Sequence, residues 1–133
     1  PIVAHEFLGD SVEGKDVVII DDMISSGESM LDVAKQIKER KAKRVFICTT
    51  YGLFTDGLKK FDEYYEKGWI DKVITTNLNY RDPELLTRPY YVEANMSKYL
   101  ASIMDIINHD LSVEKVRSSN EKIMELMEKV EKR

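Results

Sequence analysis

The stretch Val17–Ser29, V-V-I-I-D-D-M-I-S-S-G-E-S, decides the fold of this 133-residue chain. It opens with four β-branched aliphatic residues, which is typical of a strand buried on both faces of a parallel sheet. Two acids follow, then a loop of small residues, and a helical pattern begins near Ser29. In open α/β sheets, ligands bind beyond the carboxyl ends of the strands. The stretch therefore predicts a binding site where this strand ends.

The rest of the chain repeats the change from strand to helix. Further strands are expected at 45–50, 72–76 and 90–93. Helices are expected at 29–41, between Thr55 and Gly68, and from Ser97 to about Ile107. We expect Thr55 and Ser97 to cap the second and third helices. Strands that alternate with helices predict βαβ units, and hence an α/β fold with a mainly parallel sheet.

The C-terminal segment differs from the rest of the chain. From Glu114 onward it is rich in Glu, Lys and Arg and contains neither glycine nor proline. Val116, Ile123 and Val130 recur every seven residues, which predicts an amphipathic helix. We therefore expect one domain over 1–112 and a helical tail over 113–133. The pattern leaves open whether the tail lies on its own domain or on a partner subunit.

Composition excludes several classes of function. The chain has 20 Lys and Arg against 24 Asp and Glu, so its formal charge of −4 would not attract nucleic acid. No apolar stretch approaches the ~20 residues that cross a bilayer, and no signal peptide is recognisable. A single cysteine excludes an intrachain disulfide. We therefore expect a soluble, cytoplasmic protein with neither a nucleic-acid nor a membrane partner.

The loop after the first strand has the composition of an anion-binding nest. Ser25, Ser26, Gly27 and Ser29 leave room for backbone N–H groups to converge, and the following helix adds the positive end of its dipole. Asp21 and Asp22 would repel a bare phosphate, but carboxylates suit hydroxyl donors or Mg²⁺. A ligand with a phosphate at one end and vicinal hydroxyls nearby satisfies both halves. Ribose 5-phosphate is such a ligand.

Val17–Ser29 resembles the signature of the type I phosphoribosyltransferase fold. The residues around it, at 1–10, 42–45, 51–54 and 71–77, are similar to the C-terminal half of ribose-phosphate diphosphokinases, which make phosphoribosyl pyrophosphate (PRPP). The resemblance covers about residues 1–113. It implies a three-layer α/β fold with a mainly parallel sheet of the phosphoribosyltransferase type, followed by the amphipathic helix.

The resemblance also implies roles for individual residues. Asp21 would hold the ribose hydroxyls, with Asp22 beside it. The 5-phosphate would be held by Ser25, Ser26, Gly27, Glu28 and Ser29. Glu28 stands where the family commonly has a second glycine, so we expect its carboxylate to point out of the nest.

The resemblance further implies that this chain is part of a longer enzyme, a homo-oligomer that uses ATP and Mg²⁺. The family's ATP-binding residues, metal ligands and catalytic loop precede the part that resembles this chain. We therefore expect no catalytic and no metal-binding residue among these 133, and no activity of this chain alone.

Two other functions remain open from the residues. A phosphoribosyltransferase that consumes PRPP carries the same signature, but it also needs a hood over the base and a second pyrophosphate loop. A receiver-like or other non-catalytic regulatory domain also has an acidic pair at a strand end. A receiver needs a third aspartate after a later strand, whereas the second expected strand leads into Thr49–Gly52.

Overall fold

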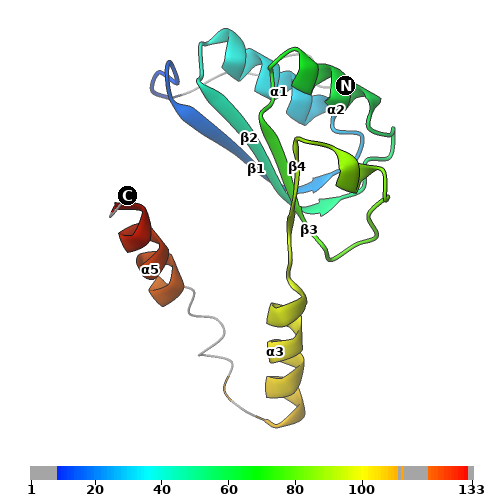
Figure 1. Ribbon diagram of the computed structural model, residues 1–133, viewed down its shortest axis with the longest axis vertical. Coiled ribbons are helices and arrows are strands. Elements are labelled where there is room, and N and C mark those ends of the chain that lie inside the picture. Colours follow the sequence, from blue (N-terminus) through cyan, green and yellow to red (C-terminus); the bar gives the residue numbers. More distant parts are fainter. Residues whose placement is uncertain (1–8, 111, 113–119, 132–133) are drawn as a thin grey trace. The chain divides into compact units, whose positions relative to one another are not determined.

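The computed structural model describes residues 9–110, 112 and 120–131. The chain divides into two compact units, Pro1–Asn95 and Met96–Arg133 (Figure 1). The domain boundary expected after residue 112 adjoins residues 111 and 113–119, which lie outside the described part, and it stays a prediction.

The first unit is a parallel β-sheet with two α-helices. Its elements in chain order are β1 (Asp16–Ile24), α1 (Glu28–Glu39), β2 (Arg44–Gly52), α2 (Lys59–Glu66), β3 (Lys72–Thr76), the 3₁₀ turn η1 (Leu85–Thr87) and β4 (Tyr91–Ala94). The strands lie in the order β1-β2-β3-β4, and every neighbouring pair is parallel. The predicted α/β class with a parallel sheet is confirmed.

Both helices cover the same face of the sheet (Figure 1). Each crossover is right-handed in nearly all proteins, and here each one steps the same way along the sheet, so α1 and α2 fall on one side. The core lies between these layers. Its buried residues are Ile24, Met30, Leu31, Ala34, Ile37, Ala42, Val45, Ile47, Phe61, Ile70, Val73 and Tyr90.

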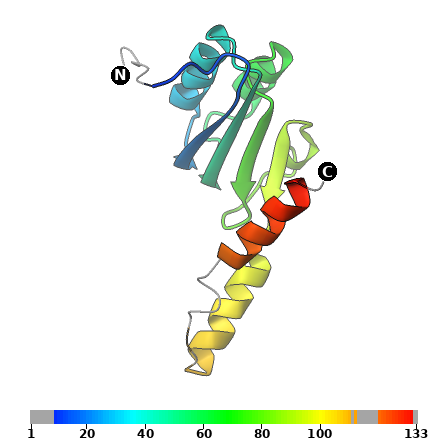
Figure 2. The same ribbon diagram turned by 90° about the vertical axis from the view of Figure 1, so that its left-hand side faces the viewer.

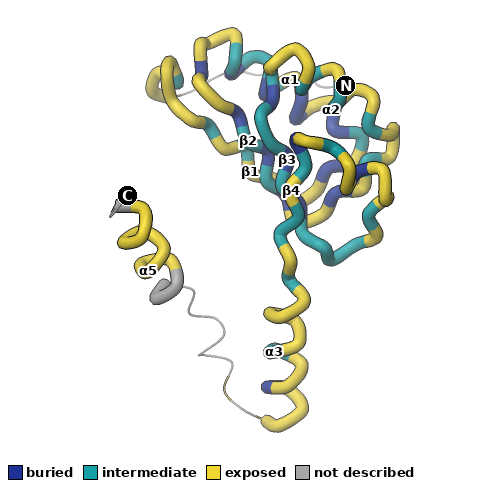
Figure 3. Tube along the Cα trace, in the orientation of Figure 1, coloured by how far each residue is buried: buried dark blue, intermediate teal, exposed yellow. Residues whose placement is uncertain are grey.

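The opposite face of the sheet is open in this unit (Figure 3). Val18 and Ile20 of β1 are 53% and 80% exposed, and Val92 of β4 is 40% exposed. Among residues 9–95, the helices therefore cover one face of the sheet. A helix reaches the second face only when the strand order reverses, and the described strands never reverse.

Two helix starts differ from the expectation. Helix α2 begins at Lys59 after Leu58, and no side chain caps it. Thr55 instead donates its backbone N–H to the carbonyl of Ser25, so it belongs to the preceding loop. In the second unit Ser97 is the first residue of its helix, which follows Met96 without a side-chain cap. Both capping predictions were wrong. Gly68, which follows α2, adopts the left-handed conformation with φ +70°.

Asp62 on α2 anchors the segment that leads into β4. Its carboxylate accepts hydrogen bonds from Arg88 Nε at 2.8 Å and Nη2 at 3.0 Å, and from the Tyr90 hydroxyl at 2.7 Å. Tyr90 is 1% exposed, so this bond satisfies a buried hydroxyl. Burial and the nearby carboxylate both raise the pKa of Tyr90, which keeps it a neutral donor.

The second unit contains α3 (Ser97–Asn108) and α5 (Asn120–Glu131). The tail helix is thus confirmed over 120–131, while Val116 of its heptad pattern lies outside the described residues. Apolar side chains of α5 are exposed, with Ile123 at 49% and Val130 at 73%. In the part of the chain that the structure describes, no helix combines the length and the apolar character needed to cross a bilayer.

Candidate functional site

The acidic pair lies at the carboxyl end of β1. Asp21 and Asp22 are both exposed and belong to the strand, which continues to Ile24. The inward–outward alternation of β1 breaks here, because Asp21, Asp22 and Met23 are exposed in succession before Ile24 is fully buried. The Asp22 N–H donates to Asp21 Oδ1 at 2.8 Å, which orients that carboxylate and leaves its second oxygen to accept from a ligand.

The loop at 25–27 turns the chain from β1 into α1, and Gly27 fixes its path. Gly27 has φ +83° and is buried. A Cβ at this position would lie 2.3 Å from Cζ and 2.6 Å from Cε2 of the Phe61 ring. Phe61 has no exposed surface and packs edge-on against Phe54, with ring centroids 5.1 Å apart. A side chain at residue 27 would therefore require this buried ring to shift, which favours glycine between the loop and α2.

The next loop of the sheet braces this one. Leu53 donates its N–H to the Ile24 carbonyl at 2.8 Å, and Thr55 donates to the Ser25 carbonyl at 3.0 Å. Carbonyls of the 24–25 segment are thereby turned into the protein. Helix α1 begins at Glu28, and the first amides of a helix have no acceptor within it. These amides and the helix dipole together favour an anion in front of residues 26–29.

Glu28, the first residue of α1, is the one acid among residues 25–29, and a lysine of α2 neutralises it. Its Oε1 forms an ion pair and a hydrogen bond with Nζ of Lys60. The hydrogen bond from Lys60 is the main cause that lowers the pKa of Glu28 below its ordinary value, so the pair is charged at neutral pH. The expectation that Glu28 turns away from the nest has this partner as a physical basis. Lys60 lies 32 residues away, and sequence spacing gave no signal for it.

The predicted site residues fall on one continuous segment, from the end of β1 to the first turn of α1. Their exposure differs: Ser26 is half-buried and Gly27 buried, whereas Ser25 and Ser29 are exposed. Ser26 Oγ accepts the Glu28 N–H at 3.4 Å, a weak bond that a ligand oxygen could replace. The segment therefore presents backbone and hydroxyl donors beside two exposed carboxylates.

Metal binding by this chain alone has little support in the geometry. Over 9–110, 112 and 120–131, no three His, Cys, Asp or Glu side chains are grouped so that they could hold a metal ion. Asp21 and Asp22 supply two carboxylates. Mg²⁺ is commonly bound by one or two carboxylates together with water and the phosphates of a substrate. The pair therefore fits a Mg²⁺ ion that a bound substrate helps to hold.

A one-sided parallel sheet with an acidic strand end and a small-residue turn into a helix defines an α/β protein with a phosphoribosyltransferase-like fold. The model of one family, the phosphoribosyl synthetase-associated domain, matches residues 4–116. The chain therefore belongs to the phosphoribosyl synthetase family, as its signature predicted.

Comparisons with individual proteins agree with this assignment. A ribose-phosphate pyrophosphokinase of Vibrio cholerae is 33% identical over 106 residues, which are 80% of this chain and 32% of that protein. One of Thermosipho africanus is 46% identical over 46 residues, 35% of this chain and 15% of that protein. The crystal structure of phosphoribosylpyrophosphate synthetase from Mycobacterium smegmatis superposes with a TM-score of 0.66 at 22% identity, covering 77% of this chain and 33% of that one. The matched part is thus a third or less of the length of each of these relatives.

Proposed function

We propose that this chain is the part of a ribose-phosphate diphosphokinase that binds ribose 5-phosphate. The observation that carries the proposal is the arrangement at the end of β1. Two exposed carboxylates precede a glycine-pinned loop that opens at the start of α1. The amides of residues 26–29 would hold the 5-phosphate, and Asp21, with Asp22 beside it, would accept from the ribose hydroxyls.

In the whole enzyme, the sugar held here would receive a diphosphoryl group from ATP at its anomeric hydroxyl. Bound Mg²⁺ would neutralise the charge of the phosphates during this transfer. The work of this chain is to position the sugar, and the nucleotide would be held by protein outside it. We further propose that the whole enzyme acts in the cytoplasm as a homo-oligomer, as expected from the sequence.

Asp21→Asn is expected to weaken ribose 5-phosphate binding about 10- to 150-fold, because a hydrogen bond to a charged group contributes about 1.5–3 kcal/mol. The matched control is Asp32→Asn. Asp32 lies on α1, the helix that follows the site loop, and its carboxylate accepts from the Tyr64 hydroxyl of α2. Isothermal titration calorimetry measures the affinity of each variant for ribose 5-phosphate. Equal affinities would show that Asp21 does not contact the sugar.

Glu28 and Lys60 are expected to have opposite effects on phosphate affinity. Lys60→Gln leaves the Glu28 carboxylate unneutralised at the nest and should weaken binding about two- to fivefold, since exposed ion pairs contribute little. Glu28→Gln should strengthen binding by a similar factor. Both effects should shrink as ionic strength rises. If Glu28→Gln weakens binding, the carboxylate takes part in holding the ligand, and the outward orientation is wrong.

A further inference from the structure

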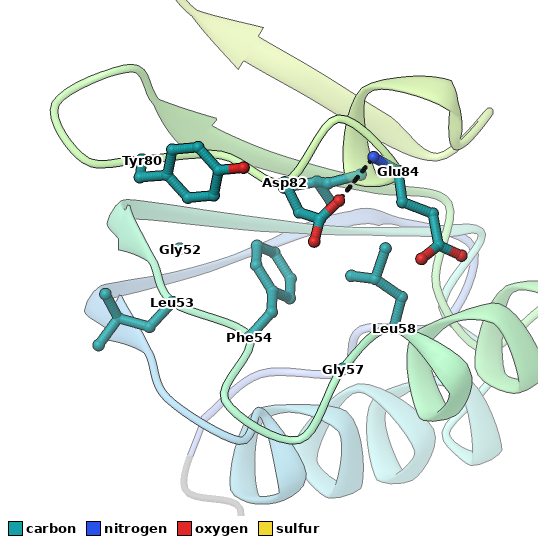
Figure 4. Close-up of a pocket in the computed structure, with 9 residues that line it drawn as sticks. Gly52, Leu53, Phe54, Gly57, Leu58, Tyr80, Asp82 and Glu84 are labelled. Atoms are coloured by element: carbon teal, nitrogen blue, oxygen red, sulfur yellow. Dashed lines mark hydrogen bonds between the residues drawn. The ribbon is translucent and has the colours of Figure 1, made fainter.

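A cavity of ≈ 200 Å³ lies beside the nest, between the β2–α2 loop and the segment that precedes β4 (Figure 4). One wall comes from residues 52–58 and the other from residues 80–85. Phe54 and Leu58 point from the first wall toward Asp82 on the second, whereas Leu53 points away (Figure 4). The lining thus combines an apolar floor with two acids on the second wall, Asp82 and Glu84.

Both walls are held rigidly. Phe54 adopts φ +50°, an uncommon conformation for a bulky residue. Its ring lies so close to Gly52 that a Cβ there would meet Phe54 Cε2 at 2.6 Å. Asn79 Nδ2 donates to the Gly52 carbonyl at 2.9 Å and so ties the second wall to the first. Residues held in uncommon backbone conformations cluster at active sites and ligand-binding segments.

Of the two acids in the lining, Asp82 is the one whose carboxylate faces Phe54 (Figure 4). Its Oδ1 accepts the Glu84 N–H at 2.8 Å, which fixes the carboxylate (Figure 4). Glu84 is itself paired with Arg88 through Nη2 at 2.6 Å, and Arg88 is held by Asp62. Among the residues that the structure describes, Asp82 forms no ion pair. Its second oxygen is therefore available to a donor that enters the cavity.

Size limits what can enter. A cavity of about 150 Å³ holds benzene, and drug-sized ligands occupy about 300–1,000 Å³. At ≈ 200 Å³ this cavity suits one aromatic ring with a short substituent. The apolar floor would bind the ring, and a positively charged substituent would pair with Asp82. We propose that this cavity is a second binding site, specific for a small aromatic amine in its protonated form.

The proposal is tested by an NMR titration of the whole isotope-labelled chain with benzylamine, using benzyl alcohol as the neutral probe of the same shape. Benzylamine should bind saturably at millimolar concentration and shift amides of residues 52–58 and 80–85. Benzyl alcohol should bind at least about tenfold more weakly, since it cannot pair with the carboxylate. Equal binding of the two probes, no saturable binding, or shifts confined to residues 21–29 would each overturn the proposal.

A variant of the protein tests the role of the Asp82 charge directly. Asp82→Asn removes the charge but keeps an oxygen that can accept the Glu84 N–H, so the segment should keep its fold. It should lower benzylamine affinity about tenfold or more and leave benzyl alcohol unchanged. Glu66→Gln, an exposed acid on α2 outside the cavity, is the matched control and should leave both affinities unchanged. Unchanged benzylamine affinity in Asp82→Asn would also overturn the proposal.

Discussion

Gly27→Ala is expected to lower the free energy of unfolding by about 2–5 kcal/mol. The left-handed backbone at φ +83° costs a residue with a Cβ about 1–2 kcal/mol. The contact at 2.3 Å with the buried Phe61 ring adds an overpacking cost of about 1–3 kcal/mol. Urea denaturation, monitored by circular dichroism, measures the total loss in the free energy of unfolding.

Gly68→Ala is the matched control for this change. Gly68 has φ +70°, but a Cβ there would meet nothing within 4 Å. It should therefore cost only the backbone part, about 1–2 kcal/mol. Equal losses for the two variants would show that Phe61 does not constrain the loop. If Phe61 does constrain the loop, adding Phe61→Leu to Gly27→Ala should restore part of the lost stability. If it does not, the second change should restore none.

The purified chain is expected to form no PRPP from ATP, Mg²⁺ and ribose 5-phosphate. Diphosphoryl transfer needs a nucleotide held in line with the sugar, and loss of such positioning forfeits about 7–11 kcal/mol of barrier reduction. Lys60, the cation at the nest, is already paired with Glu28. A coupled assay should read background for this chain.

The ribose-phosphate pyrophosphokinase of Vibrio cholerae, which is about three times as long as the part it shares with this chain, is the natural positive control in that assay. Turnover by the 133-residue chain above background would mean that these residues also hold the nucleotide. It would contradict the proposal that they only bind and position the sugar.

Local patterns were sufficient for much of the fold. The β-branched run before Asp21 predicted a parallel strand, and the change of period near Ser29 predicted the helix that follows. Both are set by neighbours in sequence. The one-sided sheet was not predicted, because the apolar runs of β1 and β2 read as buried on both faces, whereas Val18 and Ile20 face an open side here.

The site was predictable as a segment but not as an arrangement. The acids, serines and Gly27 are consecutive, so the signature was enough to find them. The break in alternation at Asp22, the Phe61 ring against Gly27 and the Lys60 partner of Glu28 depend on how α2 packs. Thr55 is a further example. Its residue type and position predicted a cap for α2, but its N–H donates to the Ser25 carbonyl instead. Contacts between segments that are distant in the chain produce no periodic pattern in the sequence.

Binding of ribose 5-phosphate at the end of β1 is the central claim, and an NMR titration of the isotope-labelled chain tests it most directly. We expect saturable binding, with the largest shifts at the amides of residues 21–29, competition by inorganic phosphate, and far weaker binding of ribose without its phosphate. Equal binding of ribose and ribose 5-phosphate, or shifts that leave residues 25–29 unchanged, would contradict the account.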